Sequence, residues 1–404
     1  MSIKPAPPLS HRARIIPASP IRKLVPLAED AKRRGIHVYH LNIGQPDIAT
    51  PEEFFRAVHG FDEKVIAYKN SQGLAEFIES MIGYYDRISI KLAKENIVIT
   101  TGGSEALMFA MMAVAEPGDE VIVFEPFYTN YNGFAIMAGV TLVPIATDPG
   151  TGYHLPPKDE IERHITDRTR AIMICNPNNP TGTVLDLSEL ELLTDLALQH
   201  DLFILSDEVY REFVYEGETT SMLKMEGLED RVVVLDSLSK RYSLCGGRVG
   251  CVVSRNTEFM ESVLRFGQAR LCTATLEQVG GAALVNTGDK YIAPMIDEYR
   301  ARRDATYEEL MNIPGIVCQK PSGAFYIMAK LPVDDIESFA RWMLTDFAHE
   351  NETTMIAPGP GFYATAGMGN QEARIAYVLN AEECRRAVRL LARGISEYNN
   401  ASRN

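Results

Sequence analysis

Between about residues 75 and 255, apolar strand-like runs alternate with segments that repeat apolar residues at helical spacing. This alternation constrains the fold more than any other feature of the sequence. Uninterrupted apolar runs predict strands buried on both faces, in a mostly parallel sheet that helices cover on both sides. The pattern predicts strands over residues 96–100, 120–124, 141–145, 171–175, 202–205 and 231–235. It predicts helices over residues 74–85, 105–115 and 187–200.

The ends of the chain follow a different pattern. Residues up to about 20 predict an extended, proline-punctuated arm, followed by a helix over 21–34 and a strand over 37–41. Beyond about residue 260, long helical patterns lead into a mixture of short strands and helices. We therefore expect an α/β fold with three parts: an N-terminal arm and part of a small domain (1–50), a large domain with a seven-stranded type of sheet (51–295), and a smaller α+β domain (296–404).

The composition excludes several classes of protein. The 404 residues are 46% hydrophobic and 23% charged, as in ordinary globular proteins, and the net charge of -14 argues against nucleic-acid binding. Six cysteines lack CxxC spacing and eight histidines lack any regular ligand spacing, so we expect a reduced, cytoplasmic protein without a metal site. We expect neither a secretory signal nor a membrane span, since no apolar run is long enough.

In parallel α/β sheets, ligands bind at the carboxyl ends of the strands, so the residues after each strand are the candidates for a site. Strand 231–235 is followed by Ser237, Ser239, Lys240 and Arg248. Arginine and serine donors suit a phosphate, and a lysine held among partly buried groups can lose its proton and attack a carbonyl. The alternative is a surface loop with two solvated cations.

Two further strand ends suggest an anion and a flat ring. Strand 96–100 runs into Gly103 and Ser104 at the start of a helix, where free N–H groups favour a phosphate; alternatively, Ser104 only caps that helix. Strand 120–124 runs towards Tyr128, an aromatic residue that could stack on a heterocycle or could simply pack.

The remaining two strand ends carry an amide and a carboxylate. Asn179 lies in the turn Asn-Pro-Thr-Gly after strand 171–175, and Asp207 and Tyr210 follow strand 202–205 about one helical turn apart. A buried aspartate needs a cationic partner, which a pyridinium nitrogen would supply. We expect Glu208, between them, to be solvated.

Together these strand ends describe a site for pyridoxal phosphate. This flat, phosphorylated aldehyde needs an amine, phosphate donors, a stacking aromatic and a carboxylate at its ring nitrogen. The loop at Gly103 has neither the GxGxxG of dinucleotide sites nor the GK[ST] of a P-loop, so a nicotinamide-dependent dehydrogenase is not supported.

In the order and spacing of these motifs, the chain resembles the fold-type I, class I/II aminotransferases of the aspartate aminotransferase superfamily. The resemblance runs from about residue 9 to the C-terminus, and it implies the pyridoxal-phosphate-dependent transferase fold. It implies that Lys240 forms the Schiff base and moves the proton, that Asp207 keeps the ring nitrogen protonated, and that Tyr210 and Asn179 bind the ring's phenolic oxygen. It implies a phosphate cradle of Gly103, Ser104, Ser237, Ser239 and Arg248, with Tyr128 stacked on the ring.

The resemblance also implies residues for the substrate and for a second subunit. Arg374 resembles the arginine that clamps the substrate α-carboxylate, together with Gly44 and Asn179; alternatively, Arg374 pairs with a surface acid. Tyr68 resembles the tyrosine that reaches the cofactor phosphate of a neighbouring subunit, which implies a homodimer with shared sites.

Our hypothesis is an aminotransferase that moves an amino group from an L-amino acid, with aspartate as the leading donor, to a 2-oxo acid such as 2-oxoglutarate. The motifs leave open a C–S lyase that eliminates instead, and a non-catalytic regulator built on the same fold. They do not identify the donor, because no arginine in the sequence can be assigned to a second substrate carboxylate.

Overall fold

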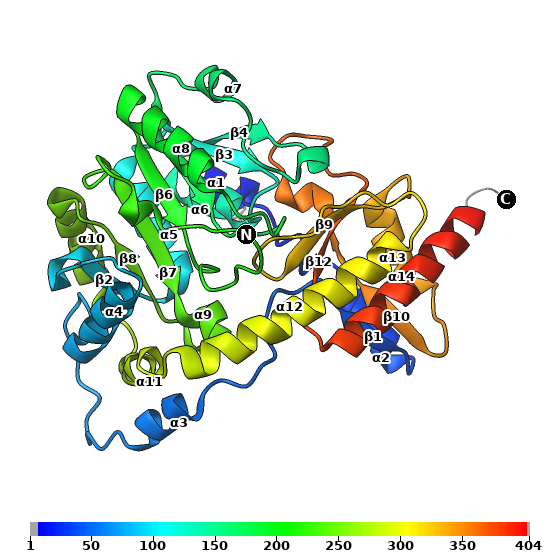
Figure 1. Cartoon of the computed structure of the whole chain (residues 1–404), viewed down its shortest axis with the longest axis horizontal. Coiled ribbons are helices and arrows are strands. Elements are labelled where there is room, and N and C mark those ends of the chain that lie inside the picture. The colour runs from blue at the N-terminus through cyan, green and yellow to red at the C-terminus, as the bar shows by residue number, and fades with distance from the viewer. Residues whose placement is uncertain (1–6, 402–404) are drawn as a thin grey trace, which may run out of the picture.

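A seven-stranded sheet forms the centre of the molecule in the computed structural model, which describes residues 7–401 (Figure 1). Its strand order is β2-β8-β7-β6-β5-β3-β4. All neighbouring strands are parallel except β8, which runs antiparallel to β2 and β7. The strands are β2 (Ile97–Thr100), β3 (Glu120–Glu125), β4 (Thr141–Ala146), β5 (Thr169–Cys175), β6 (Phe203–Asp207), β7 (Val232–Ser237) and β8 (Gly250–Val253). The predicted mostly parallel sheet of an α/β fold is confirmed.

Helices cover both faces of this sheet, which explains why its strands are continuous apolar runs. Side chains alternate along a strand, so Ile122 and Ile172 join the core on one face while Val121 and Met173 join the core on the other. The first face packs against α4 (Ala75–Arg87) and α8 (Leu187–His200), and the second against α5 (Gly102–Val114), α6 (Asn130–Ala138) and α10 (Thr257–Arg270).

A second group of strands combines the two ends of the chain. β1 (His37–His40) pairs in parallel with β10 (Glu352–Met355), and β9 (Tyr326–Lys330), β11 (Ala357–Pro358) and β12 (Glu372–Ala376) form a sheet in the order β11-β12-β9. These strands pack with α2 (Val25–Arg33), α13 (Ile336–Thr345) and α14 (Ala381–Ala401). Ala28 and Val38 from the N-terminal segment therefore share one core with Leu344 and Leu391.

The long helix α12 (Asp289–Met311) runs from the central sheet towards these C-terminal strands (Figure 1). The predicted boundary between residues 295 and 296 falls inside this single helix. The remaining helices are α1 (His11–Ile15), α3 (Glu52–His59), α7 (Lys158–Glu162), α9 (Leu238–Arg241) and α11 (Thr275–Val285). The 3₁₀ turns are η1 (Lys94–Asn96), η2 (Pro149–Thr151), η3 (Met222–Lys224), η4 (Cys245–Gly247) and η5 (Gly359–Phe362).

The structure corrects three expectations about local elements. The N-terminal arm contains helix α1, because the Ser10 hydroxyl caps it by accepting from the N–H of Ala13. Helix α2 begins at Val25 rather than at residue 21, with Pro26 in its first turn, where proline is tolerated. Strand β8 was not predicted, since it has only four residues and begins with a glycine.

Within residues 7–401, no helix has the length and apolar character needed to cross a bilayer.

Candidate active site

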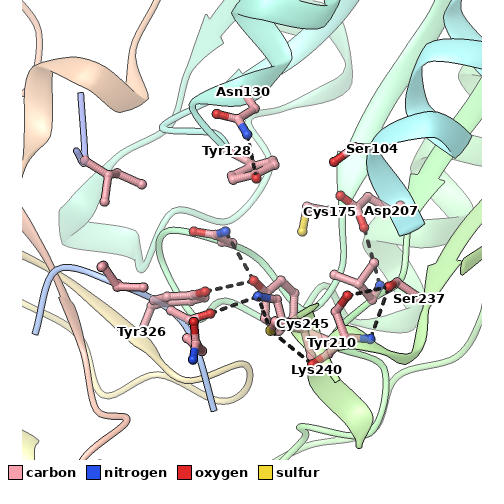
Figure 2. A pocket seen from close by; sticks show the side chains of 18 of the residues that line it. Ser104, Tyr128, Asn130, Cys175, Asp207, Tyr210, Ser237, Lys240, Cys245 and Tyr326 are labelled. Carbon is pink, nitrogen blue, oxygen red and sulfur yellow. Dashed lines mark hydrogen bonds between the residues drawn. The ribbon is translucent and has the colours of Figure 1, made fainter. Parts of the chain in front are cut away.

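A cavity of about 600 Å³ lies at the carboxyl ends of the central strands (Figure 2). It brings together twelve of the thirteen residues that the sequence predicted for the site. They are Gly44, Gly103, Ser104, Tyr128, Asn179, Asp207, Tyr210, Ser237, Ser239, Lys240, Arg248 and Arg374. The parallel topology explains this convergence, because β5, β6 and β7 all end at the same edge of the sheet.

Lys240 supplies the amine of the site. It lies in α9 directly after β7, and its Nζ donates to the backbone oxygen of Gly44 at 2.8 Å. Burial lowers the pKa of the Lys240 amine below its ordinary value, and Arg374 and Arg248 lower it further. A lowered pKa favours the neutral amine, which is the nucleophilic form.

Asp207 ends β6 and is 5% exposed. Its Oδ2 accepts from the hydroxyl of Tyr131 at 2.8 Å, and its burial raises the pKa of the carboxyl to about 6. Among residues 7–401, no lysine, arginine or histidine forms an ion pair with it. A buried carboxylate of this kind fits a cation that comes from outside the chain, such as a protonated ring nitrogen.

Three side chains form a hydrogen-bonded row along one wall of the cavity. The amide of Asn179 donates to the hydroxyl of Tyr210 at 3.3 Å, and the hydroxyls of Tyr210 and Tyr326 lie 2.8 Å apart (Figure 2). Burial raises the pKa of Tyr210 well above its ordinary value, so its phenol stays protonated and remains a donor. Sequence reasoning missed Tyr326, since a tyrosine in an apolar strand is more often a core residue.

The phosphate-cradle residues surround the N-terminus of α5. That helix begins at Gly102, and its N-cap is Thr101, which makes no side-chain capping bond. The alternative reading of Ser104 as the N-cap is therefore wrong. The N–H groups in this first turn have no helical partner, and Gly103 and Ser104 line the cavity, as in anion sites at helix N-termini.

Arg248 completes this cradle and lies close to Gly102. Gly102 has a φ of +73°, which favours glycine, and a Cβ there would also lie 2.6 Å from an Nη atom of Arg248. Ser237 and Ser239 lie beside it, with their hydroxyl oxygens 2.9 Å apart. Two hydroxyls, a guanidinium and free N–H groups are a donor set that suits a phosphate.

Arg374, in β12, is a buried guanidinium with 2% exposure. Its Nη atoms donate to Asn179 Oδ1 at 2.9 Å and to the oxygen of Asn42 at 2.6 Å, whereas its Nε has no partner. No acidic residue in the described part of the chain pairs with it, which contradicts the alternative of a surface ion pair. The cation is available to a carboxylate that enters the cavity.

Gly44 allows the backbone to approach this centre. A Cβ on Gly44 would lie 1.7 Å from the hydroxyl oxygen of Tyr326, so no larger residue fits without a rearrangement. The loop thereby places the Gly44 carbonyl against Lys240 Nζ.

Two residues named in the sequence analysis, Tyr68 and Glu208, lie outside the cavity. Tyr68 does not line the cavity of its own chain, and its side chain is 81% exposed. Glu208 was expected to be solvated, but it is 2% exposed and lies 2.7 Å from Arg211. It faces away from the strand end into the core, where it also accepts from Ser221.

The cavity also contains residues that the sequence did not indicate. Ser19, Ile21 and Arg22 reach it from the N-terminal segment, and Cys245 places its sulfur 3.7 Å from Lys240 Nζ. Tyr131, whose hydroxyl donates to Asp207, was also missed. Its only sequence signal was its position one helical turn after Tyr128.

Taken together, the donor set fits pyridoxal phosphate. The amine, the buried carboxylate without a cation and the phosphate donors each match one functional group of that cofactor. Within the residues that the structure describes, no group of three His, Cys, Asp or Glu side chains could hold a metal ion.

Comparisons with known proteins agree with this chemistry. The family model "Aminotransferase class I and II" matches residues 36–391. The aspartate aminotransferase of Thermotoga maritima is 31% identical over 358 residues, covering 88% of this chain and 92% of that protein. The aromatic-amino-acid aminotransferase 2 of Thermococcus litoralis is 30% identical over 398 residues, covering 96% of this chain and 98% of that protein.

Solved structures show the same likeness. The Thermotoga maritima aspartate aminotransferase superposes with a TM-score of 0.88 at 29% identity, covering 96% of this chain and all of that one. An alanine aminotransferase from Pyrococcus furiosus superposes with a TM-score of 0.87 at 30% identity and the same coverage of this chain. This chain therefore belongs to the aminotransferase class I and II family and is a pyridoxal-phosphate-dependent aminotransferase.

Proposed function

We propose that this aminotransferase moves the amino group of L-aspartate to a 2-oxo acid such as 2-oxoglutarate. One observation carries the proposal: the Lys240 amine, favoured in its neutral form, shares a cavity with Arg374, a buried cation that no acid of the described chain neutralises. The first group suits covalent chemistry with an aldehyde, and the second suits an amino-acid carboxylate. The choice of aspartate follows the names of the relatives.

The residues of the cavity would hold the cofactor at three points. Lys240 would attach it covalently, Asp207 would pair with its ring nitrogen, and Ser237, Ser239, Arg248 and the Gly103 and Ser104 N–H groups would bind its phosphate. Tyr128 would lie against its ring, and Asn179 and Tyr210 would donate to its phenolic oxygen. When bound, pyridoxal phosphate supplies an aldehyde that bonds amines and a cationic ring that withdraws electrons.

The substrate is then oriented by the protein. The Arg374 fork would grip the α-carboxylate, with Asn179 and the backbone of Gly44 beside it, so that the substrate Cα–H points at Lys240. Lys240 Nζ would accept the substrate Cα proton, and the resulting ammonium would hold that proton beside the reacting atoms for its return. The buried wall of Tyr210 and Tyr326 excludes water from this transfer.

We further propose a domain division, a homodimer and a cytoplasmic location. The division is an N-terminal segment (1–50), a large domain (51–295) and a small domain (296–404), and the separate sheets and cores support it. A homodimer is supported by Tyr68, which is exposed on a segment with the exposed apolar residues Val65 and Ile66. Six free cysteines support a reducing compartment.

The experiment follows the absorption of the purified, cofactor-loaded protein while single amino acids are added without an acceptor. Aspartate should shift the spectrum to that of the aminated cofactor, and 2-oxoglutarate should reverse the shift. Pyruvate and ammonia released from cystathionine without an acceptor would instead identify a C–S lyase.

A Lys240→Ala variant provides the control for the mechanism. It should lose the covalent attachment and about 10²- to 10⁴-fold or more of the transfer rate, because it removes the group that moves the proton. A variant that still turned over at the original rate would contradict the proposal.

A further inference from the structure

The charges that line the cavity are unequal. Four cations contribute to its wall (Arg22, Lys240, Arg248 and Arg374), whereas Asp207 is the only acidic residue there among the described part of the chain. The proposed function matches Lys240 with the cofactor aldehyde, Arg248 with its phosphate and Arg374 with the substrate α-carboxylate. Arg22 is then the one cation of the wall without an assigned anion.

Arg22 is held at the cavity by the packing of its neighbours. Pro20 lies against Gly361 of η5, where a Cβ on the glycine would come within 2.4 Å of the proline ring. Ile21 packs on the apolar cluster of Phe362 and Tyr363. Residues 20 and 21 therefore fix the backbone, so that residue 22 lies at the cavity.

The guanidinium of Arg22 has no bonding partner in the described part of the chain. Its side chain is exposed and has no hydrogen bond or ion pair within residues 7–401. The next residue differs, since Lys23 forms a salt bridge with Glu337. An arginine at a cavity wall with its fork free is suited to a planar carboxylate.

Tyr128 lies close enough to Arg22 for the arginine charge to affect its pKa. Burial raises the pKa of the Tyr128 phenol, and Arg374, Arg248 and Arg22 oppose that rise. Arg374 and Arg22 are therefore within electrostatic reach of the same side chain. Beside it, the Asn130 amide donates to the Tyr128 hydroxyl at 2.8 Å and adds polar character to this wall (Figure 2).

We infer that Arg22 binds the distal carboxylate of the substrate and selects dicarboxylic amino acids and 2-oxo acids over monocarboxylic ones. The inference rests on the proposed function and assigns its substrate class to a residue of this chain. A substrate with two carboxylates would pair with both guanidiniums, neither of which has an acidic partner in the described part of the chain, whereas a monocarboxylic substrate would leave Arg22 without an anion.

The test measures the binding of two unreactive acids to the cofactor-loaded protein by calorimetry. Succinate carries two carboxylates and propionate carries one. An Arg22→Met variant should bind succinate roughly 10- to 100-fold more weakly, as expected for a lost charge-assisted bond, while its propionate affinity stays unchanged. Arg22→Lys, which keeps the charge but loses the fork, should fall between the two.

Lys23→Met is the matched control, because it removes a neighbouring cation that lies outside the cavity. It should leave succinate and propionate binding unchanged. The same pattern should appear in the half-reactions, where Arg22→Met should lower kcat/KM for aspartate but not for alanine.

The inference is overturned if Arg22→Met binds succinate as the original protein does, or if it loses both acids equally. The first result would place the distal cation elsewhere, such as on a second subunit. Failure of the proposed function is distinguishable, because the unmodified protein would then not convert aspartate, whatever Arg22→Met does to succinate binding.

Discussion

At the residue scale, burial sets the chemistry of the ionisable groups in the cavity. Lys240 tends to lose its proton and Asp207 tends to keep one, because each charged form is poorly solvated there. The tendency of Asp207 would reverse on cofactor binding, since a cationic ring nitrogen would stabilise the ionised carboxylate. Without the cofactor, the ionised Asp207 carboxylate is poorly solvated, and the bound cofactor would offset this cost.

Asp207→Asn should stabilise the cofactor-free protein at neutral pH. The folded state raises the pKa of Asp207 from 3.8 to about 6, so the folded chain binds the proton more tightly than the unfolded chain. The stability that this proton provides is present at low pH and is lost as the pH rises through about 6. Above that range the penalty is up to about 3 kcal/mol, and asparagine avoids it.

Thermal unfolding of the two cofactor-free proteins from acid to neutral pH measures this difference. The variant should gain stability relative to the original protein as the pH rises, yet its amino transfer should fall by about 10²- to 10³-fold, because it cannot balance the charge of the ring. A stability difference that does not change with pH would show that folding does not raise the pKa of Asp207.

At the scale of the element, buried ion pairs stabilise the junction between β7 and α9. Asp236 is fully buried and accepts from Arg241 at 3.0 Å, and Arg211 lies 3.2 Å from its other oxygen. Burial would raise the pKa of Asp236, but the two arginines outweigh it and the pKa is lowered. Because Arg241 follows Lys240 in this four-residue helix, the pair fixes the helix that carries the Lys240 amine.

Asp236→Asn should destabilise the protein by about 3–5 kcal/mol, since Arg211 and Arg241 lose the buried carboxylate that they share and keep only Glu208 and Glu212 as acidic partners. Unfolding in urea gives the value. The matched control is Asp159→Asn, which breaks the exposed pair of Asp159 with Arg163 and should change stability by about 0.5 kcal/mol or less. A loss below about 1 kcal/mol for Asp236→Asn would show that the turn is held by other contacts.

At the scale of the whole molecule, residues from distant parts of the chain line the cavity. Arg374 enters from β12 and Lys240 from α9, so the site depends on how the C-terminal strands pack against the central sheet. Tyr68 lies outside this arrangement with 81% of its side chain exposed. It gains a role in the proposed function only if a second chain is present.

Tyr68→Phe therefore tests the homodimer. The unmodified protein should sediment with twice the mass of one chain, and the variant should keep that mass. Its cofactor affinity should fall by about 10-fold, because one hydrogen bond to the charged phosphate is lost. A monomer in solution, or a variant with unchanged affinity, would contradict the proposed contribution of Tyr68.

The sequence indicated the site wherever a functional residue directly follows a strand. Lys240, Asp207 and Asn179 were predicted because a buried strand and the first residues beyond it are contiguous, and a parallel sheet brings such strand ends together. Tyr131, Tyr326 and Arg22 were not predicted. Each belongs to an element whose local pattern is an ordinary helix, strand or loop.

The sequence by itself thus determined the sheet and the cofactor chemistry, and it singled out Lys240 as the candidate amine, since these follow from local periodicity and short motifs. Only the tertiary structure decided which charges remain without a partner. Glu208 became buried against Arg211, while Arg374 and Arg22 line one cavity without an acidic partner in the described part of the chain. Pairing depends on distances between residues far apart in the chain, and packing sets those distances.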